Sequence, residues 1–471
     1  MAALHPHKHI GILSPTTLFA VCLVVSVAVC MALCPAEAPS QTLRSAAAAS
    51  QNAREKASDA PRNLPLKTRR AIFERIWNEI DEHYYDPAFN GVNWDDVHTR
   101  YLPRVVATKN NQEFYALMSE LTGELHDAHT RFSSPEQWRN FKRQQRVSPG
   151  FSVDDVDGKT VVIHVRPESS AAKAGIEPGM VLLTIDGRSV EDRIAEIEKT
   201  RAASSSDRAT RLFVFGRLLG GAANSTMKVS LRRGDGTTLE ASVVRQTYSA
   251  IPEVGTDVLP SGAAYIHFDG FQPRIVGQFR RALVRFRNSP GLVIDLRRNG
   301  GGDLSALLPI AGYFFDKKTV FAKDSTRSGK PLTQFAGIFR LPLELSVGRP
   351  GDQIYAGPVA ILVDARSASS SEVFAAGMQD TRRAKIIGSP TCGCVLGIAK
   401  PRELKGGSAL EMSEVLWFSP NGRKLEGAGV IPDEEVIPTV EDLRQKRDPV
   451  IAQAEKVLHQ LIAGDRRIAR R

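Results

Sequence analysis

The first regular pattern along the chain is helical. Between residues 67 and about 142, apolar side chains recur with the 3.6-residue period of an amphipathic helix. The stretch NQEFYALMSELTGEL repeats the period of an earlier stripe, which consists of Ile72, Ile76, Trp77 and Ile80. We therefore expect a small N-terminal helical domain at residues 65–145.

From about Pro149 the pattern changes to that of strands. The stretches TVVIHV, MVLLTIDG, MKVSLRR and LEASVVR alternate or run apolar, and DG and GDG turns separate them. This predicts a β-rich domain at residues 146–248. A helical insertion interrupts it from about Ile194 to Asn224, and no function is assigned to that insertion.

The rest of the chain, residues 249–471, alternates strands with helices. Such alternation is typical of an α/β core built around a mostly parallel or mixed sheet. A last helix is expected from about Pro449 to Ala463. The fold class is thus multidomain α+β and α/β, with a helical domain, a β-rich domain and an α/β core.

The N-terminus carries an apolar run that predicts export. Residues 18–34 contain no charge and precede AEAPS, which offers Ala36 and Ala38 to a signal peptidase. We expect residues 1–38 to be a cleaved signal peptide. An uncleaved membrane anchor is the alternative, because the run is near the ~17-residue minimum for a bilayer span. Residues 39–64 have a linker composition, so the body of the chain is expected in the periplasm or at the cell envelope.

Charge and cysteine content narrow the function classes. The net charge is +10, but no basic patch is interleaved with aromatic residues, which argues against nucleic-acid binding. Three of the five cysteines belong to the predicted leader, which leaves Cys392 and Cys394 in TCGC. Without histidines at ligand spacing these two form no zinc site; they are either paired with each other or simply small buried side chains. No metal or organic cofactor is implied.

The stretch VAILVDARSASSSEVFAAGMQD carries the first candidate chemistry. An apolar strand meets a polar turn, and a helix begins at the serines. The amides and dipole of a helix N-terminus favour the negative charge that develops on a carbonyl oxygen during acyl transfer. Helix capping explains one serine, for which Ser371 is a candidate, but it does not explain four serines in five positions.

A Gly-rich turn, GLVIDLRRNGGGD, is the second candidate element. Consecutive glycines after a buried strand expose backbone N–H groups and permit unusual dihedral angles. The turn lacks the Gly-Lys-Ser/Thr ending of a phosphate-binding loop. We interpret it as an oxyanion-hole strand.

The string SSAAKAGIEPGMVLLTIDGRSV resembles a PDZ domain of the bacterial kind. The resemblance implies that Gly150–Val153 (Gly150, Phe151, Ser152 and Val153) is the carboxylate-binding loop. The amides of Phe151 and Ser152 would then hold a peptide C-terminus while the peptide adds as a strand. The alternative is a β-rich packing module without a ligand.

Together, the PDZ-like string, DLRRNGGG, RSASSSE with MQD, and LEGAGVIPD resemble the C-terminal processing (tail-specific) protease family over residues 65–440. The resemblance implies a crotonase-like catalytic core with Ser369 as nucleophile. It places the oxyanion-hole amides at Ser370 and Gly301, with Gly300 as an alternative. It also matches Asp380 to an acid of the following helix.

One position departs from this family pattern. The lysine base of the better-known members is replaced by Cys394, and Lys400 would need a different backbone path. The chain therefore also resembles the tricorn-type branch, which uses serine, histidine and glutamate. That resemblance implies His129 as base and Glu426 as its orienting acid.

Several alternatives to this pair stay open. His126 would lie on the same face as His129 if the segment were helical, and Asp433 and Asp380 are alternative acids. The expected function is an exported serine endopeptidase of envelope or unfolded proteins that recognises polypeptide C-termini. A catalytically inactive PDZ-type scaffold and a hydrolase of small esters are the competing hypotheses. Contact with the membrane is expected only through the N-terminal segment.

Overall fold

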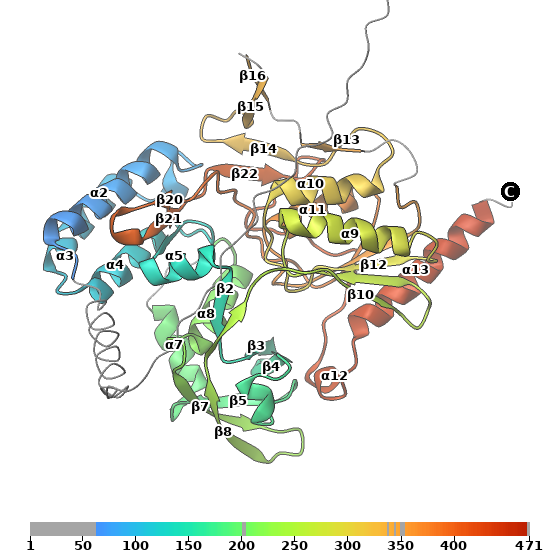
Figure 1. The fold of residues 1–471 in the computed structure, drawn as a ribbon, viewed down its shortest axis with the longest axis horizontal. Helices are drawn as coiled ribbons and strands as arrows, with labels where there is room; N and C mark the ends of the chain where they lie inside the picture. The colour runs from blue at the N-terminus through green and yellow to red at the C-terminus, as the bar shows by residue number, and fades with distance from the viewer. Residues whose placement is uncertain (1–62, 200–203, 337–338, 343–344, 349–353, 469–471) are drawn as a thin grey trace, which may run out of the picture. The chain divides into compact units, whose positions relative to one another are not determined.

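The computed structural model describes residues 63–199, 204–336, 339–342, 345–348 and 354–468 (Figure 1). The predicted leader at residues 1–38 and almost all of the predicted linker lie outside these ranges. Among the helices in the described part of the chain, none is both long and apolar enough to cross a membrane.

The N-terminal part is helical, as predicted. Ile72, Ile76 and Ile80 are fully or almost fully buried, so the predicted stripe faces a core. Its elements are α2 (Leu66–His83), η1 (Phe89–Gly91), α3 (Trp94–Ala107), α4 (Asn111–Gly123) and α5 (Pro135–Lys142).

A distant part of the chain completes this helical core. Leu404, Leu410 and Met412 pack among the helix side chains, and Figure 1 shows β20 (Arg402–Glu403) and β21 (Ala409–Glu411) beside the helices. The strand β1 (Arg131–Ser133) pairs antiparallel with β21, which gives the order β1-β21-β20.

The β-rich part has its own core and an open sheet with two edge strands, β3 and β8. Its sheet has the order β3-β4-β5-β7-β8, with β6 paired to β5, so β3 is an edge strand; the helix α8 packs beside it. The elements are β2 (Gln145–Ser148), β3 (Phe151–Val156), β4 (Lys159–Val165), α6 (Ser170–Lys173), β5 (Val181–Ile185), β6 (Arg188–Ser189), α7 (Val190–Lys199), α8 (Asp207–Leu219), β7 (Thr226–Arg232), β8 (Thr238–Val244) and β9 (Gln246–Ser249).

The α/β core is built on a mixed sheet of order β10-β11-β12-β18-β19-β23. Only β10 runs antiparallel; the other strands are parallel. The strands are β10 (Gly255–Val258), β11 (Ala264–His267), β12 (Leu292–Asp295), β18 (Val359–Val363), β19 (Lys385–Gly388) and β23 (Glu434–Glu435).

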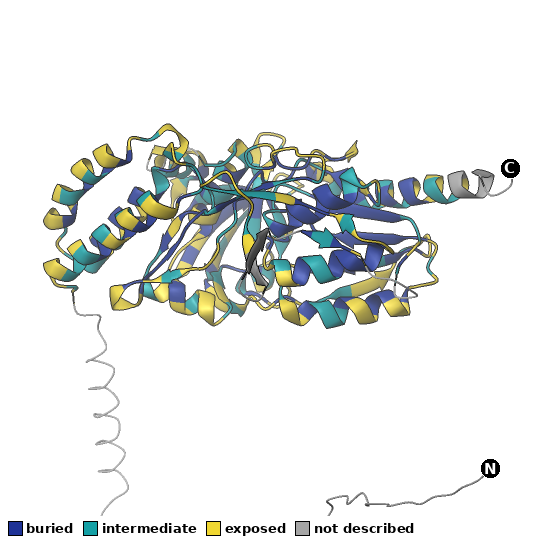
Figure 2. Cartoon of the chain, turned by 90° about the horizontal axis from the view of Figure 1, so that it is seen from above, coloured by how far each residue is buried: buried dark blue, intermediate teal, exposed yellow. Residues whose placement is uncertain are grey.

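Helices cover both faces of this sheet, which explains its continuous apolar strands. Ile294 and its alternate neighbours pack under α9 (Pro273–Arg285), α10 (Leu304–Ala311) and α11 (Ser370–Asp380). Val293 faces the other way, toward α13 (Pro449–Ile468). Figure 2 shows the buried strands between more exposed helices.

Short elements between α10 and β18, and after β19, were not predicted. They are η2 (Gly312–Phe314), β13 (Thr319–Val320), β14 (Lys323–Thr326), β15 (Thr333–Ala336), β16 (Phe339–Pro342), β17 (Ser346–Val347), η3 (Lys405–Gly407), β22 (Val415–Phe418) and α12 (Val440–Arg444). The strand β14 pairs with β22 across about ninety residues of chain, a contact that no local pattern indicates.

Candidate active site

Ser369 occupies a strained turn between β18 and α11. Its backbone has φ 55° and ψ −119°, a conformation that costs a non-glycine residue about 1–3 kcal/mol. Its N–H donates to the carbonyl of Cys394 at 2.8 Å and to Glu372 Oε2 at 3.0 Å. The side chain is half-buried. A sharp strand-to-helix turn of this kind presents a nucleophilic serine in other hydrolases.

The other serines of the turn have structural bonds. Each hydroxyl donates to a carbonyl oxygen of the Gly-rich loop that follows β12: Ser367 to Leu296 at 2.9 Å, Ser370 to Gly302 at 2.6 Å, and Ser371 to Asn299 at 2.9 Å. These bonds explain why the turn contains so many serines. Ser369 is the one serine of this turn whose hydroxyl does not attach the turn to the loop.

Gly301 lies directly against the serine turn. Its φ is 93°, and a Cβ atom there would lie 2.7 Å from Ser369 Cβ and 2.9 Å from the amide nitrogen of Ser370. Only glycine fits this contact. Its own N–H donates to Asn299 Oδ1 at 2.9 Å, whereas Gly300 is exposed. The oxyanion-hole assignment, with the amide of Ser370 in the first turn of α11 and that of Gly301 or Gly300, stays a prediction.

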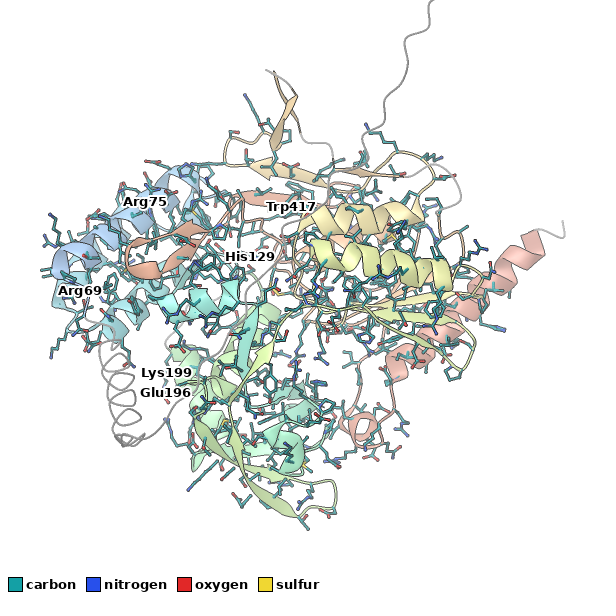
Figure 3. All side chains as sticks on the ribbon, viewed as in Figure 1. Arg69, Arg75, His129, Glu196, Lys199 and Trp417 are labelled. Atoms are coloured by element: carbon teal, nitrogen blue, oxygen red, sulfur yellow. A yellow bond between two sulfur atoms is a disulfide. The ribbon has the colours of Figure 1, made fainter. Side chains whose placement is uncertain are left out.

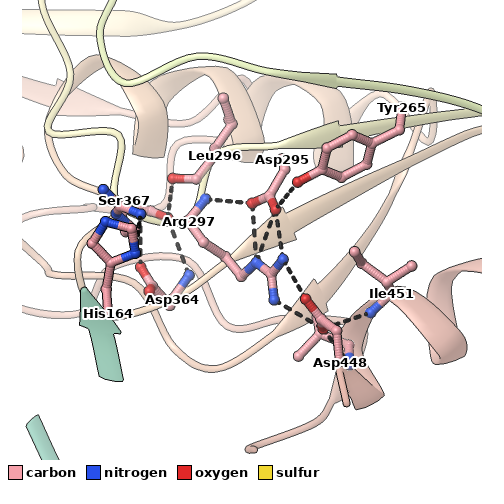
Figure 4. Close-up of polar contacts among 11 residues, drawn as sticks. His164, Tyr265, Asp295, Leu296, Arg297, Asp364, Ser367, Asp448 and Ile451 are labelled. Atoms are coloured by element: carbon pink, nitrogen blue, oxygen red, sulfur yellow. Dashed lines mark hydrogen bonds and ion pairs between the residues drawn. The ribbon is translucent and has the colours of Figure 1, made fainter. Parts of the chain in front are cut away.

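A buried ion-pair network holds the start of the Gly-rich loop (Figure 4). Asp295, at the end of β12, binds Arg297, and Arg297 also binds Asp448 at the start of α13. The side chains of Asp295 and Arg297 are 7% and 19% exposed. Tyr265 donates to Asp295 at 2.7 Å. The loop is thereby fixed to two neighbouring elements of the core.

Glu372 is fully buried and accepts hydrogen bonds from four groups around the nucleophile. Burial raises its pKa to about 7, while the hydrogen bonds oppose that rise. The donors are the Ser369 N–H (3.0 Å), the Thr391 hydroxyl (2.6 Å), the Gly393 N–H (2.7 Å) and the Cys394 N–H (3.0 Å). The carboxylate therefore joins the turn to the 391–394 loop.

The 391–394 loop contains a disulfide between Cys392 and Cys394. Of the two interpretations of TCGC, the structure has the paired one. Cys394, at the position of the family lysine, then has no free thiol to act as a base. Lys400 is exposed to solvent.

His129, labelled in Figure 3, lies in the loop between α4 and β1 and is half-buried as a residue. Its Nδ1 atom is buried and has no hydrogen-bond partner among the residues that the structure describes. Burial lowers its pKa to about 4, so the imidazole is neutral at pH 7. Asp127 fixes the backbone here, because its Oδ1 accepts the N–H groups of His129 at 2.7 Å and Thr130 at 2.6 Å.

The loop of His129 lies beside the loop of the nucleophile. Ala128 packs in one apolar cluster with Ala368, Cys392 and Cys394. The segment that contains His126 and His129 is not helical, however, so the condition for His126 to share a face with His129 is not met. The helix α4 ends at Gly123 and His126 has φ 56°, so the two histidines do not share a helix face.

Glu426 is held in the same region, but it does not bond to His129 Nδ1. Its carboxylate accepts the Val395 N–H at 2.6 Å and the hydroxyl of Ser205. Burial raises its pKa to about 7. The alternative acids are engaged elsewhere: Asp433 binds the Ile386 N–H, and Asp380 binds Arg423 at the far end of α11.

The predicted carboxylate loop, Gly150–Val153, leads into the edge strand β3. Gly150 has φ 90°, and a Cβ atom there would collide with Ser169. Phe151 and Val153 face the core, while Ser152 is half-buried. The strand also touches the catalytic turn, because Asp154 pairs with Arg366 at 2.6 Å. Peptide binding at these residues stays a prediction.

Four residues of the site were missed by sequence reasoning: Asp127, Asn299, Glu372 and Ser205. Asn299 and Glu372 stand inside the Gly-rich and serine motifs, and Asp127 lies between His126 and His129, so their positions next to predicted residues were the available signal. Ser205 had none, because it lies in the insertion to which no function was assigned.

A serine on a strained turn that lies against a Gly-rich loop is typical of a serine-hydrolase type of site. In the part of the chain that the structure describes, no group of three or more His, Cys, Asp or Glu side chains could hold a metal ion.

Comparisons with known proteins agree with this class. Residues 262–436 match peptidase family S41, and residues 65–123 match the tricorn protease C1 domain. The chain is 25% identical over 400 residues to the chloroplastic carboxyl-terminal-processing peptidase 2 of Arabidopsis thaliana, covering 80% of this chain and 70% of the relative. It is 24% identical over 423 residues to the carboxyl-terminal-processing protease of Synechocystis sp., covering 86% and 90%.

A solved structure shows the same fold. The photosystem II D1 C-terminal processing protease superposes with a TM-score of 0.54 at 22% identity, over 80% of this chain and 97% of that one. Residues 262–436 of the α/β core thus match a family S41 domain, and the chain is a serine-type peptidase. As a protease it acts on polypeptides.

Replacing Arg297 with Met should destabilise the fold. Asp295 would stay buried without its cation, which costs about 3–5 kcal/mol in buried pairs. Urea denaturation measures the free energy of unfolding. As a control, Arg447→Met breaks the more exposed pair with Asp442 and should cost less than about 1 kcal/mol. Equal losses in both variants would contradict a special role for the network.

Ser369→Ala should abolish labelling by a fluorophosphonate probe, because the probe reacts with an activated serine hydroxyl. Gel fluorescence at neutral pH measures the labelling. Ser370→Ala keeps the backbone amide and removes only the bond to Gly302, so it should still be labelled. Labelling of the Ser369 variant at the wild-type level would exclude Ser369 as the nucleophile.

Proposed function

We propose that this peptidase is an exported endopeptidase of envelope or unfolded proteins, with Ser369 as nucleophile, His129 as base and Glu426 as the orienting acid. The observation that carries the proposal is the serine turn. Every other serine in it bonds to the Gly-rich loop, and Ser369 alone occupies the strained position.

The neutral imidazole of His129 suits the base role. In the proposed reaction it takes the proton of Ser369 Oγ as that oxygen attacks the scissile carbonyl carbon. The amides of Ser370 and of Gly301 or Gly300 stabilise the oxyanion of the tetrahedral intermediate. His129 then gives the proton to the leaving amine, and water hydrolyses the acyl-enzyme.

The role of Glu426 requires His129 as a further hydrogen-bond partner, beside the two groups that its carboxylate already accepts from. His129 Nδ1 needs an acceptor, since a buried unpaired donor costs about 1–3 kcal/mol. Glu426 now bonds to Val395 N and Ser205, and Ser205 in turn bonds to the residue before His129. In the proposed mechanism, the carboxylate reaches the imidazole when substrate binds.

His129→Ala, with Cys394 intact, should lower kcat/KM on an unfolded protein substrate by at least about 100-fold, since general-base catalysis contributes about 10²–10⁴-fold. Cys394→Lys should restore nothing beyond its matched control Cys394→Ala, which also removes the disulfide. A large gain in the lysine variant, or full activity of the His129 variant, would contradict the histidine mechanism.

Recognition of polypeptide C-termini is proposed for the β-rich part. The edge strand β3, with α8 beside it, can accept a peptide as an added strand. Substrates with a free C-terminal carboxylate should then show a lower KM than the same substrates amidated at the C-terminus. Equal KM values for each pair would rule out carboxylate recognition.

Export rests on the sequence of residues 1–38. Cell fractionation and the N-terminal mass of the mature chain test it. A chain that begins at residue 1 and stays in the cytoplasm would contradict it, whereas an intact chain in the envelope fraction would indicate the anchor.

A further inference from the structure

Residues 205–208 of the helical insertion contact three loops of the catalytic region. Ser205 Oγ accepts the Ala128 N–H at 3.0 Å and donates to Glu426. Ser206 donates to the carbonyl of Cys392. The guanidinium of Arg208 bonds to the carbonyls of Thr391 and Ala428.

Through these contacts the insertion lies against the segment that contains Glu426. Gly427 donates its N–H to the carbonyl of Gly393 at 2.9 Å, and the carbonyl of Ser205 lies next to Gly427. The bonds of Ser206 and Arg208 end on backbone atoms. Ser205 differs, because its hydroxyl bonds to the carboxylate itself.

We infer that Ser205 is a positioning residue, which holds the carboxylate of Glu426 in register with the backbone that carries His129. A serine hydroxyl suits this place because it donates one hydrogen bond and accepts up to two. It can therefore serve a carboxylate and an amide at once. The inference rests on the proposed function, since it assumes that Glu426 acts with His129.

The charges around Glu426 make this donor important. Asp127 and Glu372 face it and raise its pKa further; Tyr84 and Tyr85 are also within electrostatic range, and Arg208 lies near the adjoining backbone. Hydrogen bonds from Ser205 and Val395 lower the pKa against burial, which still leaves it at about 7. Without Ser205, the pKa of Glu426 should rise, and less of the carboxylate is ionised at neutral pH.

Ser205→Ala tests the inference in the full chain, with a fluorescent unfolded casein as substrate. We expect kcat to fall about 10- to 100-fold at pH 7, as for loss of a hydrogen bond to a charged group, with little change in KM. The loss should shrink at pH 9, because the carboxylate ionises there even without Ser205. Ser205→Thr keeps the hydroxyl and should restore most of the activity.

Ser189→Ala is the matched control, since its hydroxyl accepts the Asp192 N–H in the same β-rich part. It should leave the pH profile unchanged. Thermal unfolding of each variant measures stability. A loss in Ser205→Ala that is equal at all pH values, or that follows a fall in Tm, would indicate a merely structural role and overturn the inference.

A double-mutant cycle separates this inference from the proposed function. In the Glu426→Gln background, Ser205→Ala should cost less than about 2-fold, because coupled residues are not additive. Additive losses, or full activity of Ser205→Ala, would overturn the role of Ser205 alone. Full activity of both Glu426→Gln and His129→Ala would instead overturn the proposed function.

Discussion

Four hydrogen bonds converge on the buried carboxylate of Glu372, and the shape of the catalytic turn depends on them. The strained backbone of Ser369 needs surrounding structure to hold it. Glu372 supplies that structure from one turn further along α11 and ties it to the 391–394 loop. A carboxylate with a pKa near 7 is costly to bury, so the neighbouring amides stabilise both the acid and the turn that it supports.

The site lies where the loops after β12 and β18 meet. Parallel strands end at the same edge of a sheet, and ligands of open α/β sheets bind there. The Gly-rich loop follows β12 and the serine turn follows β18, so sheet register alone brings Gly301 to Ser369. The histidine loop and the insertion come from outside the sheet and reach this edge through Ala128 and Ser205.

Local patterns predicted the helical stripe, the β-rich part, the α/β core and the serine turn, because each depends on neighbouring residues. They failed where contacts join distant segments. The hairpin that completes the helical core lies some three hundred residues beyond it, and Ser205 meets Ala128 from 77 residues away. The interpretation of His126 failed because its three-residue spacing from His129 suits a helix, whereas the backbone at His126 has a positive φ. The roles of His129, Glu426 and Gly301 remain predictions.

The contacts of residues 205–208 bear on how such a protein can be divided. Modules that recognise peptides are often treated as cassettes that can be removed or exchanged without touching a catalytic unit. Here Ser206 and Arg208, at the start of α8, also hold the loops at Cys392 and Ala428. Excising the β-rich module would therefore take away part of the wall of the catalytic centre. A chimera that keeps this centre intact has to retain residues 205–208 from this chain.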